Sequence, residues 1–170
     1  MISARRAARE AVLLVLFAAD ARHEKQVGDV EVPLEAFRTH LRHDDEVLGD
    51  LFAEDEDDPP AGLLRRARAI LDTEGQWAFV ERMVRGVADH SKAIDELIGR
   101  SSLNWKLPRM GRVDRCVLRM ATYELAFEPD VPSRATLNEA IEIAKRYGTE
   151  DSGKFVNGIL DRIAQDLERV

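Results

Sequence analysis

The sequence predicts an all-α protein, with about seven helices that form two small packed helical bundles. Apolar residues recur at three- and four-residue spacing in most segments, no segment alternates convincingly at period two, and prolines or glycines separate the periodic stretches. A length of 170 residues suits one compact domain of ordinary size. We therefore expect a single domain over 1–170, with an N-terminal helical subdomain at about 1–90 and a C-terminal one at about 91–170.

Two helices are predicted before an acidic segment. Residues 4–21 carry two apolar pairs at i, i+4 spacing with few polar interruptions, so this helix should be largely buried. A shorter helix is expected over 34–42, because its large apolar residues also follow helical spacing. Residues 43–60 then hold nine acids and no Lys or Arg, which predicts a solvated acidic loop.

The middle of the chain predicts further helices and one connection. An apolar stripe begins over 63–71 and continues over 77–87, with Gly75 as a candidate break between the two halves. A short helix is expected around 94–98. The stretch 104–108 is interpreted as a connection, because a proline disfavours helix at the residue before it.

Three helices are predicted in the last third of the chain. One apolar face runs over 112–127. Thr136 and Glu139 have the spacing of a capping box, which predicts a helix start at that threonine. Gly148 would end this helix, and the final helix should begin near 149–151.

Charge is unevenly distributed along the chain. The formal net charge is −7, yet it would be +2 without the acidic segment 43–60. Arginine supplies 20 of the 25 cations, and its planar guanidinium suits phosphate and stacks on bases. Solvated helix faces are the plainer interpretation of any one cluster. The clusters are Arg5, Arg6 and Arg9; Arg65, Arg66 and Arg68; and Arg100, Lys106, Arg109, Arg112, Arg115 and Arg119.

Catalytic signatures are absent from the sequence. There is no phosphate-binding loop, no dinucleotide-binding glycine motif, no zinc-protease His-Glu-x-x-His and no nucleophile elbow. The four histidines are scattered, and Cys116 lies in an apolar stretch typical of a buried, inert thiol. We therefore expect a protein that is not an enzyme, with no catalytic residue, no metal site and no cofactor.

The location of the protein is predicted from what the chain lacks. No apolar run approaches the roughly 20 residues that span a bilayer. The basic N-terminal start carries no small-residue cleavage site, and one cysteine excludes an internal disulfide framework. These features predict a cytoplasmic protein with no membrane contact.

Several motifs occur in the order and spacing of a known family. They are AREAVLLVLF at 8–17, Asn104-Trp105, RVDRCVLR at 112–119, YEL at 123–125, Val131-Pro132, NEAIEIAK at 138–145 and DSGKFVNGIL at 151–160. On these motifs the chain resembles NusB, the bacterial transcription antitermination factor, over nearly its whole length. The segment 151–160 is the most specific of them.

The resemblance implies a fold and a function. The fold would be two small helical bundles packed together. The function would be binding of the boxA element of ribosomal RNA leaders jointly with NusE, a ribosomal protein of the small subunit, within an RNA polymerase antitermination complex. The basic start of the first helix and the basic helix at 112–119 are compatible with an RNA partner.

The resemblance also implies site residues. Arg5, Arg6, Arg9, Asp151 and Lys154 match RNA-binding positions, whereas Phe17 and Asp114 match positions at the NusE interface. Each has a structural alternative: Arg9 could pair with an acid, Phe17 could belong to the core, and Asp151 could be only a helix cap. Lys154 could be a solvated helix residue, and Gly158 is interpreted as a close helix contact.

Two other functions stay open at this point. The first is an accessory RNA-binding domain of the kind fused to ribosomal RNA methyltransferases. The second is a self-associating scaffold, in which the Phe17 surface forms a homodimer.

Overall fold

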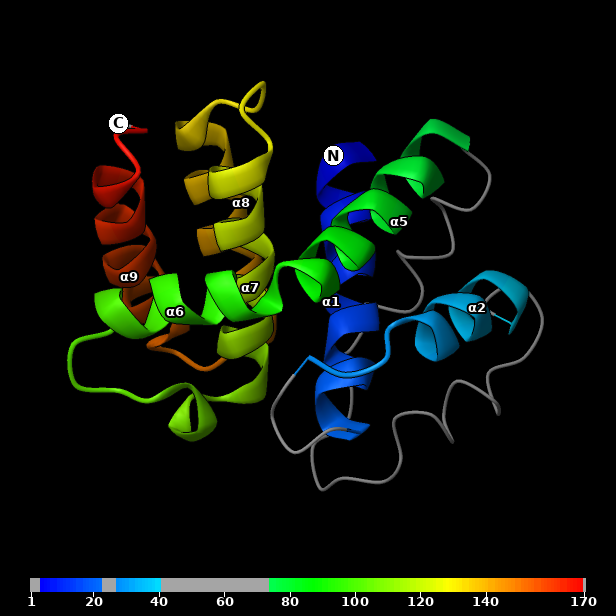
Figure 1. Cartoon of the computed structure of the whole chain (residues 1–170), viewed down its shortest axis with the longest axis horizontal. Helices are drawn as coiled ribbons and strands as arrows, with labels where there is room; N and C mark the ends of the chain where they lie inside the picture. The colour runs from blue at the N-terminus through cyan, green and yellow to red at the C-terminus, as the bar shows by residue number, and fades with distance from the viewer. Residues whose placement is uncertain (1–3, 23–26, 41–73, 170) are drawn as a thin grey trace. The chain divides into compact units, whose positions relative to one another are not determined.

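A computed structural model describes residues 4–22, 27–40 and 74–169, and within these ranges the regular structure is helical throughout (Figure 1). The all-α prediction is therefore confirmed. The acidic segment 43–60 and the expected helix at 63–71 lie outside the described residues. The helices are α1 (Ala4–Arg22), α2 (Glu31–His40), α5 (Glu74–Asp89), α6 (Ser91–Ser101), the short 3-10 helix η1 (Leu107–Arg109), α7 (Arg112–Phe127), α8 (Ser133–Tyr147) and α9 (Ser152–Asp166).

The chain divides into two compact units, Met1–Ala88 and Asp89–Val170. In the first unit, every residue of α1 from Ala8 to Asp20 is buried, as its apolar sequence predicts. Helix α2 begins three residues earlier than expected, because the Asp29 carboxylate accepts a hydrogen bond from the Glu31 backbone N–H (2.9 Å).

Side chains on α2 and α5 connect these two helices. The Phe37 and Trp77 rings stack with centroids 5.8 Å apart and an interplanar angle of 11°. Arg85 donates to both carboxylate oxygens of Glu31, at 2.9 and 3.2 Å. This bidentate pair lowers the pKa of Glu31, chiefly through the hydrogen bond. Both side chains are about half exposed, so the pair orients α2 more than it stabilises the unit.

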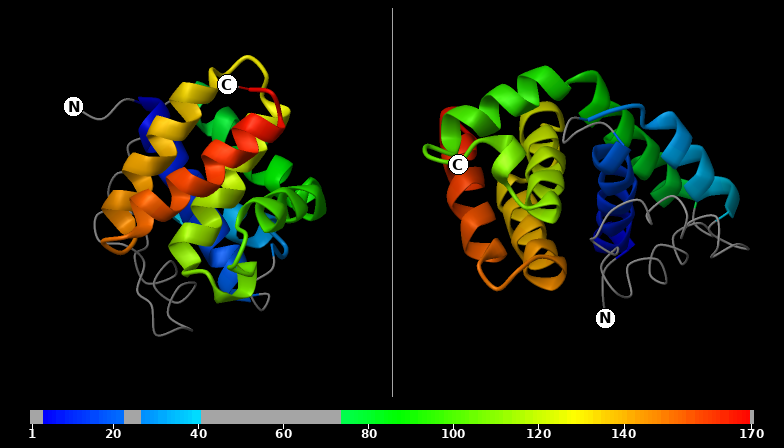
Figure 2. Two further views of the ribbon diagram at one scale, coloured as in Figure 1. Left: turned by 90° about the vertical axis from the view of Figure 1, so that its left-hand side faces the viewer. Right: turned by 90° about the horizontal axis from the view of Figure 1, so that it is seen from below.

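The second unit is built around α7, which is buried continuously from Arg115 to Leu125. Helices α8 and α9 run side by side and are joined by the short connection 148–151 (Figure 2). Their inward residues follow the predicted helical spacing. The core of the unit includes Ile94, Ile98, Val117, Leu118, Ile143, Val156, Ile159 and Leu160.

The predicted capping box at Thr136 is wrong. Helix α8 begins at Ser133, directly after Pro132, so Thr136 lies inside the helix. Its hydroxyl donates to the Glu124 carboxylate of α7 (2.7 Å), and both residues are buried. A buried carboxylate needs a hydrogen-bond donor, so Thr136 serves as the donor to Glu124 and does not cap a helix.

Two glycines are needed for reasons other than the predicted ones, or are not needed at all. Gly148 ends α8 as expected, but with φ −92°, so no left-handed conformation is involved. A Cβ there would lie 2.6 Å from Ser152 Cβ and 2.7 Å from the Ala144 carbonyl oxygen, so only glycine fits. Gly158, interpreted as a tight helix contact, has open space where its Cβ would be.

The basic helix at 112–119 is also different from the prediction. Arg115 and Arg119 are each 2% exposed, so they face the interior of the unit. Arg115 donates to the carbonyl oxygens of Leu107 (3.2 Å) and Met110 (2.8 Å), and it thereby holds η1 against α7. Arg119 makes a bidentate pair with Asp95 of α6, at 2.9 and 3.1 Å. These cations stabilise the fold and are withdrawn from any RNA.

We expect Asp95→Ala to lower the free energy of unfolding by about 2 kcal/mol, because the buried Arg119 guanidinium would lose its carboxylate. Urea unfolding measures this loss. Asp161→Ala, which removes an exposed acid of α9, is the control and should stay within about 0.5 kcal/mol of the unmodified protein. Equal losses in the two variants would contradict the structural role given to the Arg119–Asp95 pair.

Candidate nucleic-acid interface

An arginine cluster surrounds Phe79 in the first unit. The Arg5 guanidinium carbon lies 4.6 Å from the ring centroid, and those of Arg9 and Arg82 lie at 5.5 Å. Arg5 and Arg9 come from the start of α1, and Arg82 comes from α5. Cations over a ring face are held by the ring quadrupole, so Phe79 orients several guanidinium groups toward one region of the surface.

The three N-terminal arginines differ in exposure. Arg5 is exposed and Arg6 is half-buried, whereas Arg9 is only 6% exposed. The Arg9 guanidinium lies within 3.5 Å of the Arg5 carbonyl oxygen, in addition to its contact with Phe79. The first turn of α1 contains no acidic residue. Arg5 and Arg6 therefore present the charge, and Arg9 supports the start of the helix from inside.

Arg82 was not among the predicted site residues. It is exposed, and it carries positive charge to the same aromatic ring as Arg5. Its place three residues after Phe79 is visible in the sequence, but its proximity to the start of α1 depends on how α1 and α5 lie in the fold. A pattern along one helix could not have indicated this cluster.

A second group of predicted residues lies at the start of α9, in the second unit. Asp151 and Lys154 are both exposed. Asp151 occupies the cap position but makes no side-chain capping hydrogen bond, so its carboxylate is not used to start the helix. Lys145 of α8 lies over Gly153, where a Cβ would come within 2.7 Å of Lys145 Cγ. Lys145, which also forms an exposed ion pair with Glu142 (3.6 Å), thus lies against the first turn of α9, and Lys154 is in that turn.

Asp114 lies beside this helix start. It is in the first turn of α7, near Ser152 at the start of α9. Burial raises the pKa of Asp114 above its ordinary value of 3.8, and the hydrogen bond from Ser152 opposes that shift. One carboxylate oxygen, Oδ1, is buried without a hydrogen-bond partner in the structure. Maintaining this charge therefore costs free energy, and groups with such perturbed pKa values are enriched at functional sites.

Phe17, the other predicted partner residue, is 2% exposed. The structure therefore favours the core alternative, which its i, i+4 spacing to Leu13 also indicates. A partner protein would find almost none of this side chain at the surface, so the prediction of a NusE contact through Phe17 is not supported by the fold.

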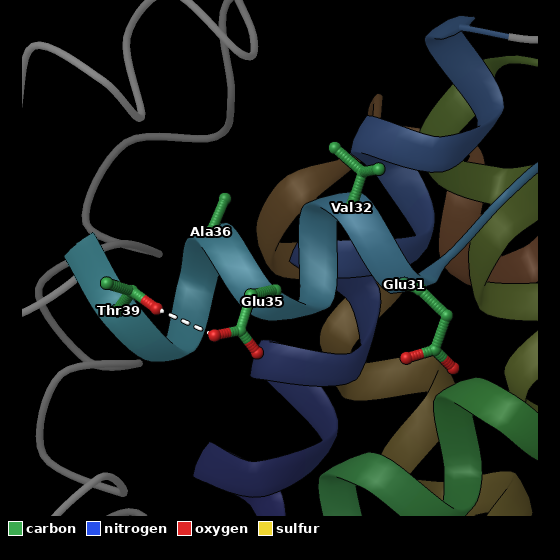
Figure 3. A pocket seen from close by; sticks show the side chains of 5 residues that line it. All are labelled: Glu31, Val32, Glu35, Ala36 and Thr39. Atoms are coloured by element: carbon green, nitrogen blue, oxygen red, sulfur yellow. Dashed lines mark hydrogen bonds between the residues drawn. The ribbon is translucent and has the colours of Figure 1, made fainter.

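A surface hollow of about 390 Å³ lies on α2 (Figure 3). Its lining includes two carboxylates, of which Glu31 is paired with Arg85 and Glu35 accepts a hydrogen bond from Thr39 (3.1 Å). Carboxylates repel phosphate, so this hollow is unsuited to a nucleic acid. In the described ranges, no three His, Cys, Asp or Glu side chains gather as metal ligands would, and no helix has the length and apolar character of a bilayer span.

A protein-family model for the NusB family matches residues 6–165. The chain belongs to the NusB family. A curated relative from Syntrophotalea carbinolica, named a transcription antitermination protein, is 44% identical over 166 residues, which cover 98% of this chain and 95% of the relative. A relative of the same name from Thermotoga petrophila is 62% identical over 85 residues, half of this chain and 60% of that one.

Solved NusB structures have the same fold. T. maritima NusB is 40% identical, has a TM-score of 0.67, and aligns over 98% of this chain and 94% of its own. A chain from a structure of antitermination factors NusB and NusE in complex with double-stranded RNA aligns over 98% of this chain and 99% of its own, with a TM-score of 0.65. That chain is 23% identical, so it supports the NusB fold alone.

We expect Asp114→Asn to raise the melting temperature at pH 7. Because burial raises the folded-state pKa of Asp114, the charged form opposes folding at neutral pH, and this penalty disappears as pH falls through that pKa toward 3.8. The gain should therefore shrink between pH 7 and pH 4 in thermal melts followed by circular dichroism. Asp130→Asn, at an exposed acid, is the control. A gain in melting temperature that grows as the pH falls would contradict a raised pKa of Asp114.

Proposed function

We propose that the chain is a non-catalytic transcription antitermination factor that binds boxA RNA of ribosomal RNA leaders together with NusE. The observation that carries this proposal is the positive charge that Arg5 and Arg6 present at the start of α1, in a chain that belongs to the NusB family. The proposal places the protein in the cytoplasm, within an RNA polymerase antitermination complex.

The RNA side of the proposal rests on the chemistry of the first unit. Arg5 and Arg6 carry positive charge at the start of α1, and Arg82 adds charge from α5. Guanidinium groups donate paired hydrogen bonds to phosphate, and they also stack on exposed bases. Phe79 holds Arg5 in place, which reduces the entropy lost when RNA binds.

The start of α9 is proposed as a second contact with the same RNA. Lys154 and Lys145 supply positive charge, and the exposed Asp151 carboxylate can accept hydrogen bonds from base amino groups. Phosphate contacts fix the path of a strand, whereas contacts to base edges distinguish sequences. Arg5 and Arg6 would therefore supply affinity, and Asp151 would contribute to the choice of bases.

Asp114 is proposed as the NusE contact. Its buried, incompletely satisfied carboxylate lies at the start of α7, where a basic partner side chain could complete its hydrogen bonding. Asp114 lies near Ser152 at the start of α9, so NusE and RNA would meet on neighbouring residues of one unit. This proximity supports joint binding of the two partners.

We expect the double variant Arg5→Ala with Arg6→Ala to bind boxA RNA on the order of tenfold more weakly, and the slope of log affinity against log salt to fall by about 1.4, as for two lost phosphate contacts on a single strand. Fluorescence anisotropy over a salt series measures both. The control is Lys92→Ala with Arg134→Ala, which also removes two exposed positive charges. An unchanged slope in the Arg5 and Arg6 variant, with normal helical content, would remove the proposed site.

We expect Asp114→Asn to bind NusE about tenfold more weakly than the unmodified protein, because a neutral amide cannot replace a carboxylate opposite a basic side chain. Isothermal titration calorimetry measures the affinity, and Asp130→Asn is again the control. Since the same Asp114 substitution should stabilise the fold, lost binding could not be ascribed to unfolding. Equal NusE affinity in the two variants would refute Asp114 as the contact.

A further inference from the structure

The connection between α6 and α7 exposes large apolar side chains. Trp105 is 54% exposed and Leu103 is 70% exposed. Only two other large apolar residues are exposed among those that the structure describes, Val32 and Phe127. An indole ring is the largest apolar side chain and is usually well buried, so its presentation on a surface calls for a function.

This connection is held in one conformation. The Ser102 hydroxyl donates to the Trp105 carbonyl oxygen (2.6 Å), and the Asn104 backbone N–H donates to the Ser102 carbonyl oxygen (2.6 Å). Arg162 of α9 donates to the Ser101 carbonyl oxygen (2.5 Å). At the other end, Arg115 donates to the Leu107 carbonyl oxygen. The backbone that carries Trp105 is therefore anchored to both α7 and α9.

Leu103 has a backbone conformation that leucine rarely adopts. Its φ of 55° is in the left-handed region, which costs a residue with a Cβ about 1 kcal/mol or more. Nothing in the leucine side chain compensates, since it is largely exposed. Strain of this kind persists where the surrounding hydrogen bonds enforce it, and it is often found at binding sites.

The segment of the chain that carries Trp105 is positively charged. Arg100, Lys106 and Arg109 are exposed, and the sequence contains no acid between Glu96 and Asp114. Within the described part of the chain, none of these three cations takes part in an ion pair. Arg162, fixed on Ser101, adds a further cation beside the same connection.

We propose that the surface formed by Trp105 with Arg100, Lys106 and Arg109 is a stacking site for a base of single-stranded nucleic acid. The base would stack on the exposed indole, and the flanking phosphates would contact the cations. This proposal deepens the proposed RNA-binding function and rests on it, with a contact of its own in the second unit.

The charge decides between a nucleic acid and a protein as the occupant. An exposed tryptophan is also common at the centre of protein interfaces. A protein partner, however, would have to bring carboxylates to every one of these cations, whereas a nucleic-acid strand brings phosphates and an aromatic base together at regular spacing. Figure 1 shows this connection and the connection from α8 to α9 at the same end of the unit, so one strand could contact both Trp105 and the start of α9.

The test uses tryptophan fluorescence. The chain has two tryptophans, so Trp77→Phe leaves Trp105 as the only indole, and Phe keeps an aromatic ring against Phe37. The probes are an oligouridylate of roughly 12 nucleotides, within the site sizes common for single-stranded binding, and inorganic polyphosphate, which has charge but no bases. We expect the oligouridylate to quench Trp105 emission at saturation and polyphosphate to leave it unquenched.

Affinity measurements on variants complete the test. Trp105→Ala should weaken oligouridylate binding about fivefold or more, and Trp105→Phe should restore most of the loss, because a base can stack on a phenyl ring. The control Val32→Ala also removes exposed apolar surface without removing a π face, so it should leave the affinity unchanged.

Two outcomes would overturn the stacking site. Unchanged oligouridylate affinity in Trp105→Ala, with weaker NusE binding, would make the surface a protein contact. Unchanged affinity of Trp105→Ala for both oligouridylate and NusE would mean that the Trp105 surface binds neither. Failure of the proposed function is distinguishable from these outcomes, because boxA RNA binding would then be insensitive to the Arg5 and Arg6 substitutions, whatever the effect at Trp105.

Discussion

A guanidinium group withdrawn from water must find acceptors, and this constraint organises the second unit. Arg119 finds a carboxylate on α6, and Arg115 finds backbone carbonyls at η1. Both arginines project from α7, so this helix fixes the elements on either side of the connection 102–111. Thr136 applies the same rule in reverse, since it supplies a donor to the buried Glu124 carboxylate. Paired polar groups thus determine how α6, α7 and α8 pack, in addition to apolar burial.

The same residue type performs a different task in the first unit. Arg5 lies at the surface, where its guanidinium contacts an aromatic face. A cation on a ring keeps its charge available to a phosphate, whereas a cation in a bidentate pair with a carboxylate does not. The distribution of arginine partners therefore separates residues that support the fold from residues that can bind a polyanion, despite a net charge of −7.

Much of the fold followed from apolar spacing, because a helical stripe is a local property of the sequence. The helices at 4–22, 112–127 and 152–166 begin and end within a few residues of the predicted positions. Errors arose where a side chain bonds to a distant segment. Thr136 had the spacing of a cap but serves Glu124, and Arg115 and Arg119 counted toward a basic surface but point inward.

The predicted site residues also divide into those that local sequence placed correctly and those whose position depends on the packed fold. Arg5, Asp151 and Lys154 lie at the surface, as a binding role requires. Arg9 and Phe17 are one and three turns further into α1, and they are buried. Arg82 was missed because its relation to Arg5 exists only after α1 and α5 have folded onto Phe79.

The close approach at Gly148 has a consequence for how this sequence can change over evolution. The missing side chain leaves room for Ser152, whose hydroxyl receives the Thr149 backbone N–H (2.8 Å). Any larger residue at position 148 would collide with Ser152 and would push the start of α9 away from the end of α8. Selection on that single atom-scale gap would therefore preserve how α9 follows α8, although the glycine itself contributes no side chain.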